Sequence, residues 1–201
     1  MPYRSAAPFF AEYLTESTKA ARSIDSSRVE LASKVLLEAY EAGSFVFVCG
    51  NGGSAAIANH LQCDHGKGVS TGTDLFPRVI SLSSNIEMVT AIANDIAYTE
   101  VFALQLRTQA RAGDVLIAVS SSGCSANIVR ALAWARDNGL HTIAMTGFSG
   151  GDARALAEID IHVECENYGV IEDQHQAIMH AMAQFIRQSR MTPEEIVSST
   201  F

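Results

Sequence analysis

The chain has 201 residues, of which 48% are hydrophobic and 18% are charged. This balance supplies enough apolar side chain for the core of one domain and excludes a disordered chain. The 14 Lys and Arg and 22 Asp and Glu residues give a formal net charge of −8, and no stretch clusters its cations, so we expect no nucleic acid as a partner.

The cysteines and the start of the chain indicate where the protein works. Its four cysteines, Cys49, Cys63, Cys124 and Cys165, form no CxxC pair, which is typical of reduced thiols in a cytosolic protein. Residues 1–14 lack the apolar core and cleavage site of a signal peptide. The apolar runs are far shorter than the ~20 residues that a membrane span needs. We therefore expect a soluble, cytoplasmic protein with no membrane partner.

Two helices are predicted at the start of the chain. Residues 8–42 repeat apolar side chains at helical spacing, with a break at 24–27 where a serine or aspartate would cap the second helix. An amphipathic helix must cover its apolar stripe with something. We therefore assign residues 1–42 to N-terminal helices that mediate oligomerisation.

From residue 44 onward, short apolar runs alternate with amphipathic segments. The predicted strands lie at 44–49, 76–82, 114–120, 141–147 and 159–165. The amphipathic segments lie at roughly 53–65, 85–110, 124–138, 150–158 and 170–190. This alternation predicts an α/β fold, with a five-stranded parallel sheet that helices cover on both faces. We assign the α/β domain to residues 43–190 and a C-terminal tail to 191–201.

Two loops rich in glycine and serine follow predicted strands. GNGGS (50–54) opens the helix after the first strand, and SSSGCS (120–125) opens another after the third. Glycines let the backbone approach a ligand, and a helix N-terminus favours an anion. Although a single Gly-Ser turn is usually only a turn, ligands of parallel sheets bind beyond the carboxyl ends of the strands. We therefore expect a phosphate monoester here, held by amides and hydroxyls.

Nucleotide cofactors are not expected at these loops. Neither loop continues into the Lys-Ser/Thr pair of a Walker A motif. The first loop also departs from GxGxxG, and no acidic residue ends the second strand.

Two predicted helices carry side chains that suit a divalent metal. His60 and Asp64 are four residues apart and share one helix face. Glu172 and His180 are eight apart and return to nearly the same face of the final helix. Together they would form a shell of two histidines and two carboxylates, which suits zinc with positions open for substrate. The alternatives are a surface His–Asp contact and, for His180, a core histidine.

Two other polar positions stay open between a structural and a functional interpretation. Asn94 and Asp95 interrupt an apolar helical pattern, either as a helix end or as groups that bind a sugar hydroxyl. Lys67 lies in a glycine-rich turn, where it points into solvent or reaches a sugar.

Six segments together resemble the SIS (sugar isomerase) domain and, within it, the sedoheptulose-7-phosphate isomerases, also called phosphoheptose isomerases. They are GNGGS (50–54), the HxxxD pair (60–64), ANDIAYTEVF (93–102), GDVLIAVSSSGCSANIVRAL (113–132), TGFSGGDARALAEIDIHV (146–163) and EDQHQAIMH (172–180). The resemblance covers nearly the whole chain. It implies a Rossmann-like three-layer α/β/α fold and a homotetramer with active sites at subunit interfaces.

The resemblance also assigns site residues by position. It places substrate contacts at Asn51, Gly52, Gly53, Ser54, Asn94, Asp95, Ser120, Ser121, Ser122 and Ser125, the four serines of 120–125 forming a phosphate cradle. His60 and His180 match metal-binding histidines, and His180 also matches the catalytic acid. Asp64 and Glu172 stand where the family has a glutamate and a glutamine, respectively.

These matches imply one zinc ion per subunit, bound by His60, Asp64, Glu172 and His180. Asp64 and Glu172 would also contact the substrate, and either one is a candidate for the catalytic base. Both acids depart from the family pattern, and so does Gly68, where the family usually has a basic residue. These departures leave the identity of the phosphosugar open.

The function implied is the isomerisation of sedoheptulose 7-phosphate to D-glycero-D-manno-heptose 7-phosphate, a step in lipopolysaccharide biosynthesis. Aldose–ketose isomerisation moves a proton between neighbouring carbons through an enediol, with a base and an acid. The alternatives are an isomerase of another ketose phosphate, a non-catalytic interaction protein like the DnaA initiator-associating branch, and a sugar-phosphate sensor. The DnaA-associating branch lacks the second acid and the final-helix histidine, whereas Asp64, Glu172 and His180 are all present here.

Overall fold

A computed structural model describes residues 5–200. The chain forms one parallel sheet with strand order β2-β1-β3-β4-β5. The strands are β1 (Phe45–Gly50), β2 (Arg78–Ser81), β3 (Val115–Ser120), β4 (His141–Thr146) and β5 (Ile159–His162). Each strand overlaps its predicted run, and the predicted five-stranded parallel sheet is confirmed.

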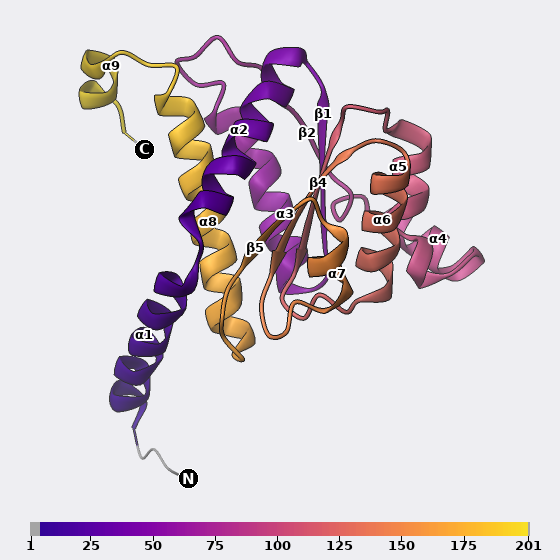
Figure 1. Ribbon diagram of the computed structural model, residues 1–201, viewed down its shortest axis with the longest axis horizontal. Coiled ribbons are helices and arrows are strands. Elements are labelled where there is room, and N and C mark those ends of the chain that lie inside the picture. The colour runs from indigo at the N-terminus through magenta and orange to yellow at the C-terminus, as the bar shows by residue number, and fades with distance from the viewer. Residues whose placement is uncertain (1–4, 201) are drawn as a thin grey trace.

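Helices cover both faces of the sheet (Figure 1). The helices are α1 (Ala6–Ser23), α2 (Ser26–Ala42), α3 (Gly53–Cys63), α4 (Ile86–Asp95), α5 (Ala103–Gln109), α6 (Ala126–Asp137), α7 (Gly151–Leu156), α8 (Tyr168–Gln188) and α9 (Pro193–Ser198). A π-helical turn, η1 (Asp64–Gly68), continues α3, and a 3₁₀ turn, η2 (Tyr98–Glu100), follows α4. Helices α2, α3 and α8 pack on one face and α4 to α7 on the other, which is the predicted three-layer α/β/α arrangement. No helix in residues 5–200 is long and apolar enough to cross a membrane.

Side chains of the central strands alternate between two cores. Val46 and Val48 of β1 lie in the core under α2, α3 and α8, whereas Phe47 and Cys49 lie in the core on the opposite face. Successive side chains of a strand point to opposite faces of a sheet. Because both faces of β1 are covered, every one of these positions is apolar, and the strand reads as a continuous apolar run.

The segment predicted as amphipathic at 85–110 is broken into three helical pieces. Helix α4 ends at Asp95, and the backbone of Ile96 and Ala97 leaves the helical region before η2 begins. The bend brings the Tyr98 hydroxyl to Asn51, where it donates to the amide oxygen Oδ1 at 2.9 Å. The loop after β1 is thereby tied to the opposite helical layer.

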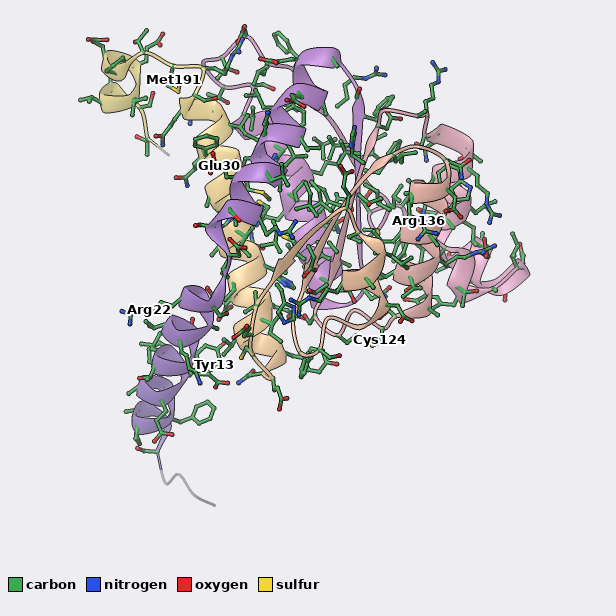
Figure 2. All side chains as sticks on the ribbon, viewed as in Figure 1. Tyr13, Arg22, Glu30, Cys124, Arg136 and Met191 are labelled. Atoms are coloured by element: carbon green, nitrogen blue, oxygen red, sulfur yellow. The ribbon has the colours of Figure 1, made fainter. Side chains whose placement is uncertain are left out.

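The two N-terminal helices differ in how they join the body. The predicted break between them is confirmed, and the Asp25 carboxylate caps α2 by accepting from the Ser27 amide at 2.9 Å. Helix α2 packs directly on the sheet, whereas α1 projects from the body (Figure 1). Tyr13, labelled in Figure 2, lies where α1 meets α8, and its hydroxyl donates to Asp173 Oδ2 at 2.6 Å. The predicted C-terminal tail contains α9. This helix begins with a capping box, in which the side chains of Thr192 and Glu195 each accept from the other residue's backbone amide.

Two buried histidines, His65 and His175, make the folded state sensitive to mild acid. Burial lowers the pKa of each imidazole from 6.5 to about 4. The unfolded chain therefore binds more protons than the folded chain between these values, and stability is lost as the pH falls through that window. We expect the free energy of unfolding, measured by urea denaturation, to decrease between about pH 6.5 and 4.

His175→Gln tests the origin of this pH dependence. His175 Nε2 lies 3.1 Å from the Thr146 carbonyl oxygen, and a glutamine amide can still donate to it but does not titrate. The variant should therefore lose stability less steeply than the wild type as the pH falls. An equally steep decrease in both proteins would contradict the assignment.

Candidate functional site

The loops after β1 and β3 line one hollow at the carboxyl edge of the sheet. Its volume is about 160 Å³, and it is lined by Asn51, Ser54, Val119, Ser120, Ser121, Ser122, Ser125, Tyr168 and Glu172. Chain order reverses between β1 and β3, because β2 lies on the other side of β1. This is the topological switch point at which open α/β sheets bind ligands. The structure thus brings together six of the predicted substrate contacts, and Glu172 with them.

Internal hydrogen bonds fix the shape of the serine loop. The Gly123 amide donates to Ser120 Oγ at 3.2 Å, and the Cys124 amide donates to Ser122 Oγ at 3.3 Å. Gly123 has a φ of 66°, and a Cβ there would overlap the backbone carbonyl of Gly150, so only glycine fits. Ser121 Oγ, in contrast, is buried without a partner among the described residues. A buried hydroxyl that lacks a partner and lines a hollow is suited to an incoming oxygen ligand.

The two glycines before Ser54 bring α3 against α8. Gly52 is the N-cap of α3 with a φ of 56°, and a Cβ on Gly53 would overlap the Glu172 carboxylate. That carboxylate therefore lies against the first turn of α3, where the helix dipole favours negative charge. Gly52 and Gly53 do not line the hollow themselves, and their contact with substrate stays a prediction.

Hydrogen bonds from Asn127 and Tyr98 hold the side chain of Asn51, which lines the hollow. Asn51 and the buried Asn127 exchange two hydrogen bonds between their side chains, both 2.9 Å, in addition to the bond from Tyr98. Sequence reasoning missed Asn127, Tyr98 and Tyr168. One signal was available, because Asn127 is a polar residue on the otherwise apolar face of a predicted helix.

Asn94 and Asp95 lie outside the hollow. Both are exposed at the end of α4, and Asn94 Nδ2 donates to Asp95 Oδ1 at 2.7 Å. Within one chain they occupy a helix end, as the structural alternative proposed. Their contact with substrate stays a prediction.

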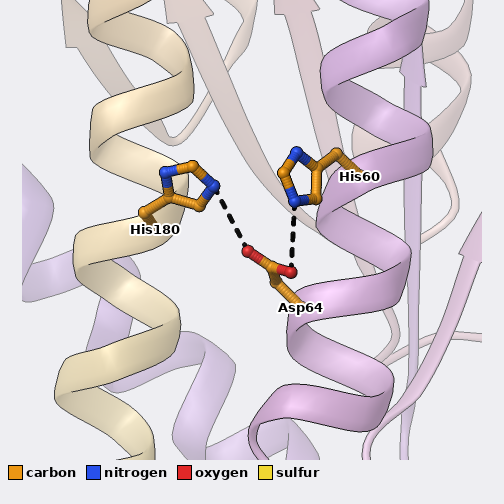
Figure 3. A group of neighbouring side chains, drawn as sticks. All are labelled: His60, Asp64 and His180. Atoms are coloured by element: carbon orange, nitrogen blue, oxygen red, sulfur yellow. Dashed lines mark ion pairs between the residues drawn. The ribbon is translucent and has the colours of Figure 1, made fainter. Parts of the chain in front are cut away.

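Three of the four predicted metal ligands meet between α3 and α8 (Figure 3). The ligand atoms of His60, Asp64 and His180 all lie within 4.8 Å of one another. His60 Nε2 is 3.3 Å from Asp64 Oδ1, and His180 Nε2 is 3.3 Å from Asp64 Oδ2. Zinc bonds of about 2.0–2.2 Å place adjacent ligands of a tetrahedral site about 3.4 Å apart. The donor types and the two spacings to Asp64 therefore fit a divalent metal ion.

Glu172, the fourth predicted ligand, is not part of this cluster. It lies two helical turns before His180, beside the serine hollow. Its membership of a metal shell therefore stays a prediction.

A π-helical turn positions Asp64 in the cluster. The Val69 amide donates to the Asp64 carbonyl at 3.0 Å, five residues back, which widens the helix at this point. The next residue, His65, is fully buried, and its Nδ1 lies 2.7 Å from the Tyr40 hydroxyl. Single π-helical turns within α-helices occur frequently at functional sites.

A second hollow adjoins the cluster on the side away from the serines. Its volume is about 210 Å³, and it is lined by Asp64, Lys67, Gly68, His180, Ala183, Gln184, Arg187 and Thr200. The exposed Lys67 thus borders the cluster, although no contact of its side chain decides between solvent and a sugar.

Comparison with known proteins agrees with this geometry. Residues 9–147 match the family model for the SIS domain. The phosphoheptose isomerase of Mycobacterium tuberculosis is 36% identical over 199 residues, which cover 96% of this chain and 98% of that protein. A probable phosphoheptose isomerase of Thermoplasma volcanium is 35% identical, covering 88% of this chain and 89% of that protein.

Solved structures give the same result. Phosphoheptose isomerase GmhA from Neisseria gonorrhoeae superposes with a TM-score of 0.82 at 31% identity, covering 91% of this chain and 97% of that chain. A phosphoheptose isomerase from Francisella tularensis gives 0.81 at 27% identity, covering 91% and 96%. The chain belongs to the SIS domain family and, within it, to the phosphoheptose isomerases, as its sequence motifs predicted.

Ser121→Ala should separate ligand binding from stability. Removing a buried hydroxyl that has no partner should leave the free energy of unfolding unchanged or raise it. The loss of a hydrogen bond to a charged group, about 1.5–3 kcal/mol, should weaken phosphate binding by roughly tenfold or more. Urea denaturation measures the free energy of unfolding, and the increase in melting temperature on adding inorganic phosphate measures phosphate binding.

Ser33→Ala is the matched control for this test. Ser33 is also a buried serine, but it lies on α2 and its hydroxyl donates to the Val29 carbonyl at 2.8 Å. Its removal should lower stability and leave phosphate binding unchanged. If Ser121→Ala bound phosphate as tightly as the wild type, the phosphate would not lie at this loop.

Proposed function

We propose that the protein isomerises sedoheptulose 7-phosphate to D-glycero-D-manno-heptose 7-phosphate. The observation that carries the proposal is the arrangement along α8. Tyr168 and Glu172 line the serine hollow, and His180, further along the same helix, belongs to the His60–Asp64–His180 cluster. A phosphate cradle and an acid–base cluster are the two parts that a phosphosugar isomerase needs. The relatives named phosphoheptose isomerase support the choice of substrate.

The spacing of the two parts suits a seven-carbon sugar. Glu172 and His180 are eight residues apart, which is about 12 Å of helix. An extended heptulose phosphate spans a comparable length, so its phosphate can rest on the serine loop while its first two carbons reach the cluster. The cradle holds the phosphate with amides and hydroxyls, as suits a chain with a net charge of −8.

The chain's own acids and histidines supply the proton transfers. Asp64 lies 3.3 Å from both His60 and His180, in the cluster that the first two carbons reach, so it is the carboxylate placed to accept a proton from the carbon beside the carbonyl. Glu172 lines the serine hollow at the phosphate end and makes no hydrogen bond or ion pair within the described residues. His180 returns a proton to the neighbouring carbon as the general acid.

A zinc ion, one per subunit, belongs to the proposal. His60, Asp64 and His180 would bind it, and it would polarise the sugar carbonyl and stabilise the charge of the enediolate.

Turnover provides the direct test. The purified protein, with and without zinc after chelation, should convert sedoheptulose 7-phosphate to an aldose that NMR detects. His180→Ala should reduce the rate by roughly 10²–10⁴, the usual contribution of a general acid or base. His141→Ala, at an exposed histidine paired with Glu158 far from the site, should leave the rate unchanged.

The other outcomes separate the alternatives. Conversion of a different ketose phosphate alone would assign the isomerase another substrate. Binding of sugar phosphates without turnover would indicate a sensor, and neither binding nor turnover would indicate a non-catalytic interaction protein.

We also propose that the protein is a cytoplasmic homotetramer assembled through its N-terminal helices. Helix α1 projects from the body and exposes Phe10 and Leu14 at 60% and 49%. Apolar side chains gathered on a projecting helix suit a contact with another copy of the chain.

Replacing both Phe10 and Leu14 with serine should disrupt this assembly. Sedimentation should report a tetramer for the wild type and a smaller species for the double variant, with loss of turnover if the active sites lie at interfaces. Phe76→Ser is the control, because Phe76 is 77% exposed but lies in the loop before β2. A wild-type monomer with full activity would contradict the proposal.

A further inference from the structure

Asn51 and Asn127 form a closed pair of carboxamides beside the serine hollow. Asn51 Nδ2 donates to Asn127 Oδ1 at 2.9 Å, and Asn127 Nδ2 donates to Asn51 Oδ1 at 2.9 Å. Asn127 is only 2% exposed, whereas Asn51 is half-buried and lines the hollow. Of the two side chains, Asn51 is therefore the one that can reach a ligand.

A backbone amide fixes which way round this pair lies. The pair alone could exchange oxygen for nitrogen in both carboxamides and keep its two hydrogen bonds, because the two ends of a carboxamide have nearly the same shape. Asn127 Oδ1 also accepts from the Ile128 amide at 3.0 Å, however, and a backbone N–H can only donate. Turning Asn127 would set its NH₂ group against this N–H. The carbonyl of Asn127 is therefore fixed, and the orientation of Asn51 is fixed with it.

The carbonyl oxygen of Asn51 has no capacity left for a ligand. It accepts from Asn127 Nδ2 and from the Tyr98 hydroxyl, both at 2.9 Å, and a carbonyl oxygen has two lone pairs. Asn51 Nδ2, in contrast, uses one of its two hydrogens on Asn127 and has no other acceptor within residues 5–200. Asn51 therefore has a donor, and not an acceptor, to offer to the hollow that it lines.

We infer that Asn127 is a positioning residue of the phosphate site, which orients the Asn51 carboxamide so that Nδ2 donates to an oxygen of the bound phosphate. The inference rests on the proposed function, since it takes the ligand of the hollow to be a phosphate monoester. Above neutral pH such a ligand is largely a dianion, whose oxygens only accept hydrogen bonds. An Asn51 side chain turned the other way would set its carbonyl oxygen against the phosphate oxygens. The orientation that Asn127 imposes thus decides whether Asn51 attracts or repels the ligand.

A double-mutant cycle with inorganic phosphate tests this role without reference to activity. Calorimetry at about pH 8 gives the phosphate dissociation constants of the full-length wild type, Asn51→Ala, Asn127→Ala and the double variant. Asn51→Ala should weaken phosphate binding roughly tenfold or more, the loss expected for a hydrogen bond to a charged group. Asn127→Ala should weaken it roughly three- to tenfold, because the Tyr98 hydroxyl can donate or accept and so allows the Asn51 carboxamide to turn. The double variant should bind no more weakly than Asn51→Ala, because Asn127 acts through Asn51.

Asn138→Ala is the matched control for the cycle. Asn138 is the C-cap of the same helix, α6, and its Nδ2 donates to the Trp134 carbonyl at 2.8 Å, so its removal should leave phosphate binding unchanged. If Asn127→Ala does not fold, Asn127→Ser repeats the cycle, because serine suits the first turn of a helix and is too short to bond to Asn51. Phosphate binding that Asn127→Ala leaves unchanged would overturn the inference. An equal loss from Asn127→Ala with and without Asn51 would also overturn it, since Asn127 would then act on the loop as a whole.

The same measurements separate this inference from the proposed function. A wild type that converts sedoheptulose 7-phosphate, but whose phosphate affinity depends on neither Asn51 nor Asn127, would overturn the inference and leave the isomerase proposal standing. A wild type that gives the expected cycle with phosphate but converts no ketose phosphate would overturn the isomerase proposal and leave the role of Asn127 standing. A wild type that binds no inorganic phosphate at all would overturn the inference.

Discussion

The close packing of α3 against α8 is the contact on which the rest of the site depends. It is possible because Gly53 has no Cβ, so that the Glu172 carboxylate lies directly against the first turn of α3. Buried side chains of both helices, among them Leu61 and Met179, continue the contact below the surface. Further along the two helices, the same packing brings His60 to His180, with ring centroids 5.0 Å apart. The interface between α3 and α8 therefore places the serine hollow, the Glu172 carboxylate and the histidine cluster at successive positions along the same two helices.

The sheet could be predicted from the sequence because its strands are covered on both faces. Val46 to Cys49 and Val115 to Val119 are apolar at every position, since each side chain enters one core or the other. The serine loop was also predictable, because residues 120–125 combine hydroxyls with a glycine that the backbone geometry requires. The residue types within each short segment were therefore sufficient to predict both the sheet and the serine loop.

The arrangement of the site was only partly predictable, because it depends on distances along helix axes. Periodicity identifies the face on which a residue lies but not how far along the neighbouring helix its partner is. His60, Asp64 and His180 share facing surfaces and meet, whereas Glu172 shares the face of His180 and lies elsewhere. The contact of Gln176 with both imidazoles had no signal in the spacing, because it requires the register of two helices that are far apart in sequence.

The π-helical turn after α3 shows how the fold places a carboxylate between two imidazoles. His60 and Asp64, four residues apart, are already neighbours on a regular helix, but His180 approaches from another helix. The widened turn from Asp64 to Gly68 departs from regular α-helical hydrogen bonding at the point where the carboxylate must face both rings. The buried pair of His65 and Tyr40 joins this turn to the core, because His65 belongs to the turn and its Nδ1 lies 2.7 Å from the Tyr40 hydroxyl. The turn from Asp64 to Gly68 and the buried pair of His65 and Tyr40 therefore form one structural unit. This explains why a fully buried histidine follows Asp64, although its ring faces the core and not the ligand cluster.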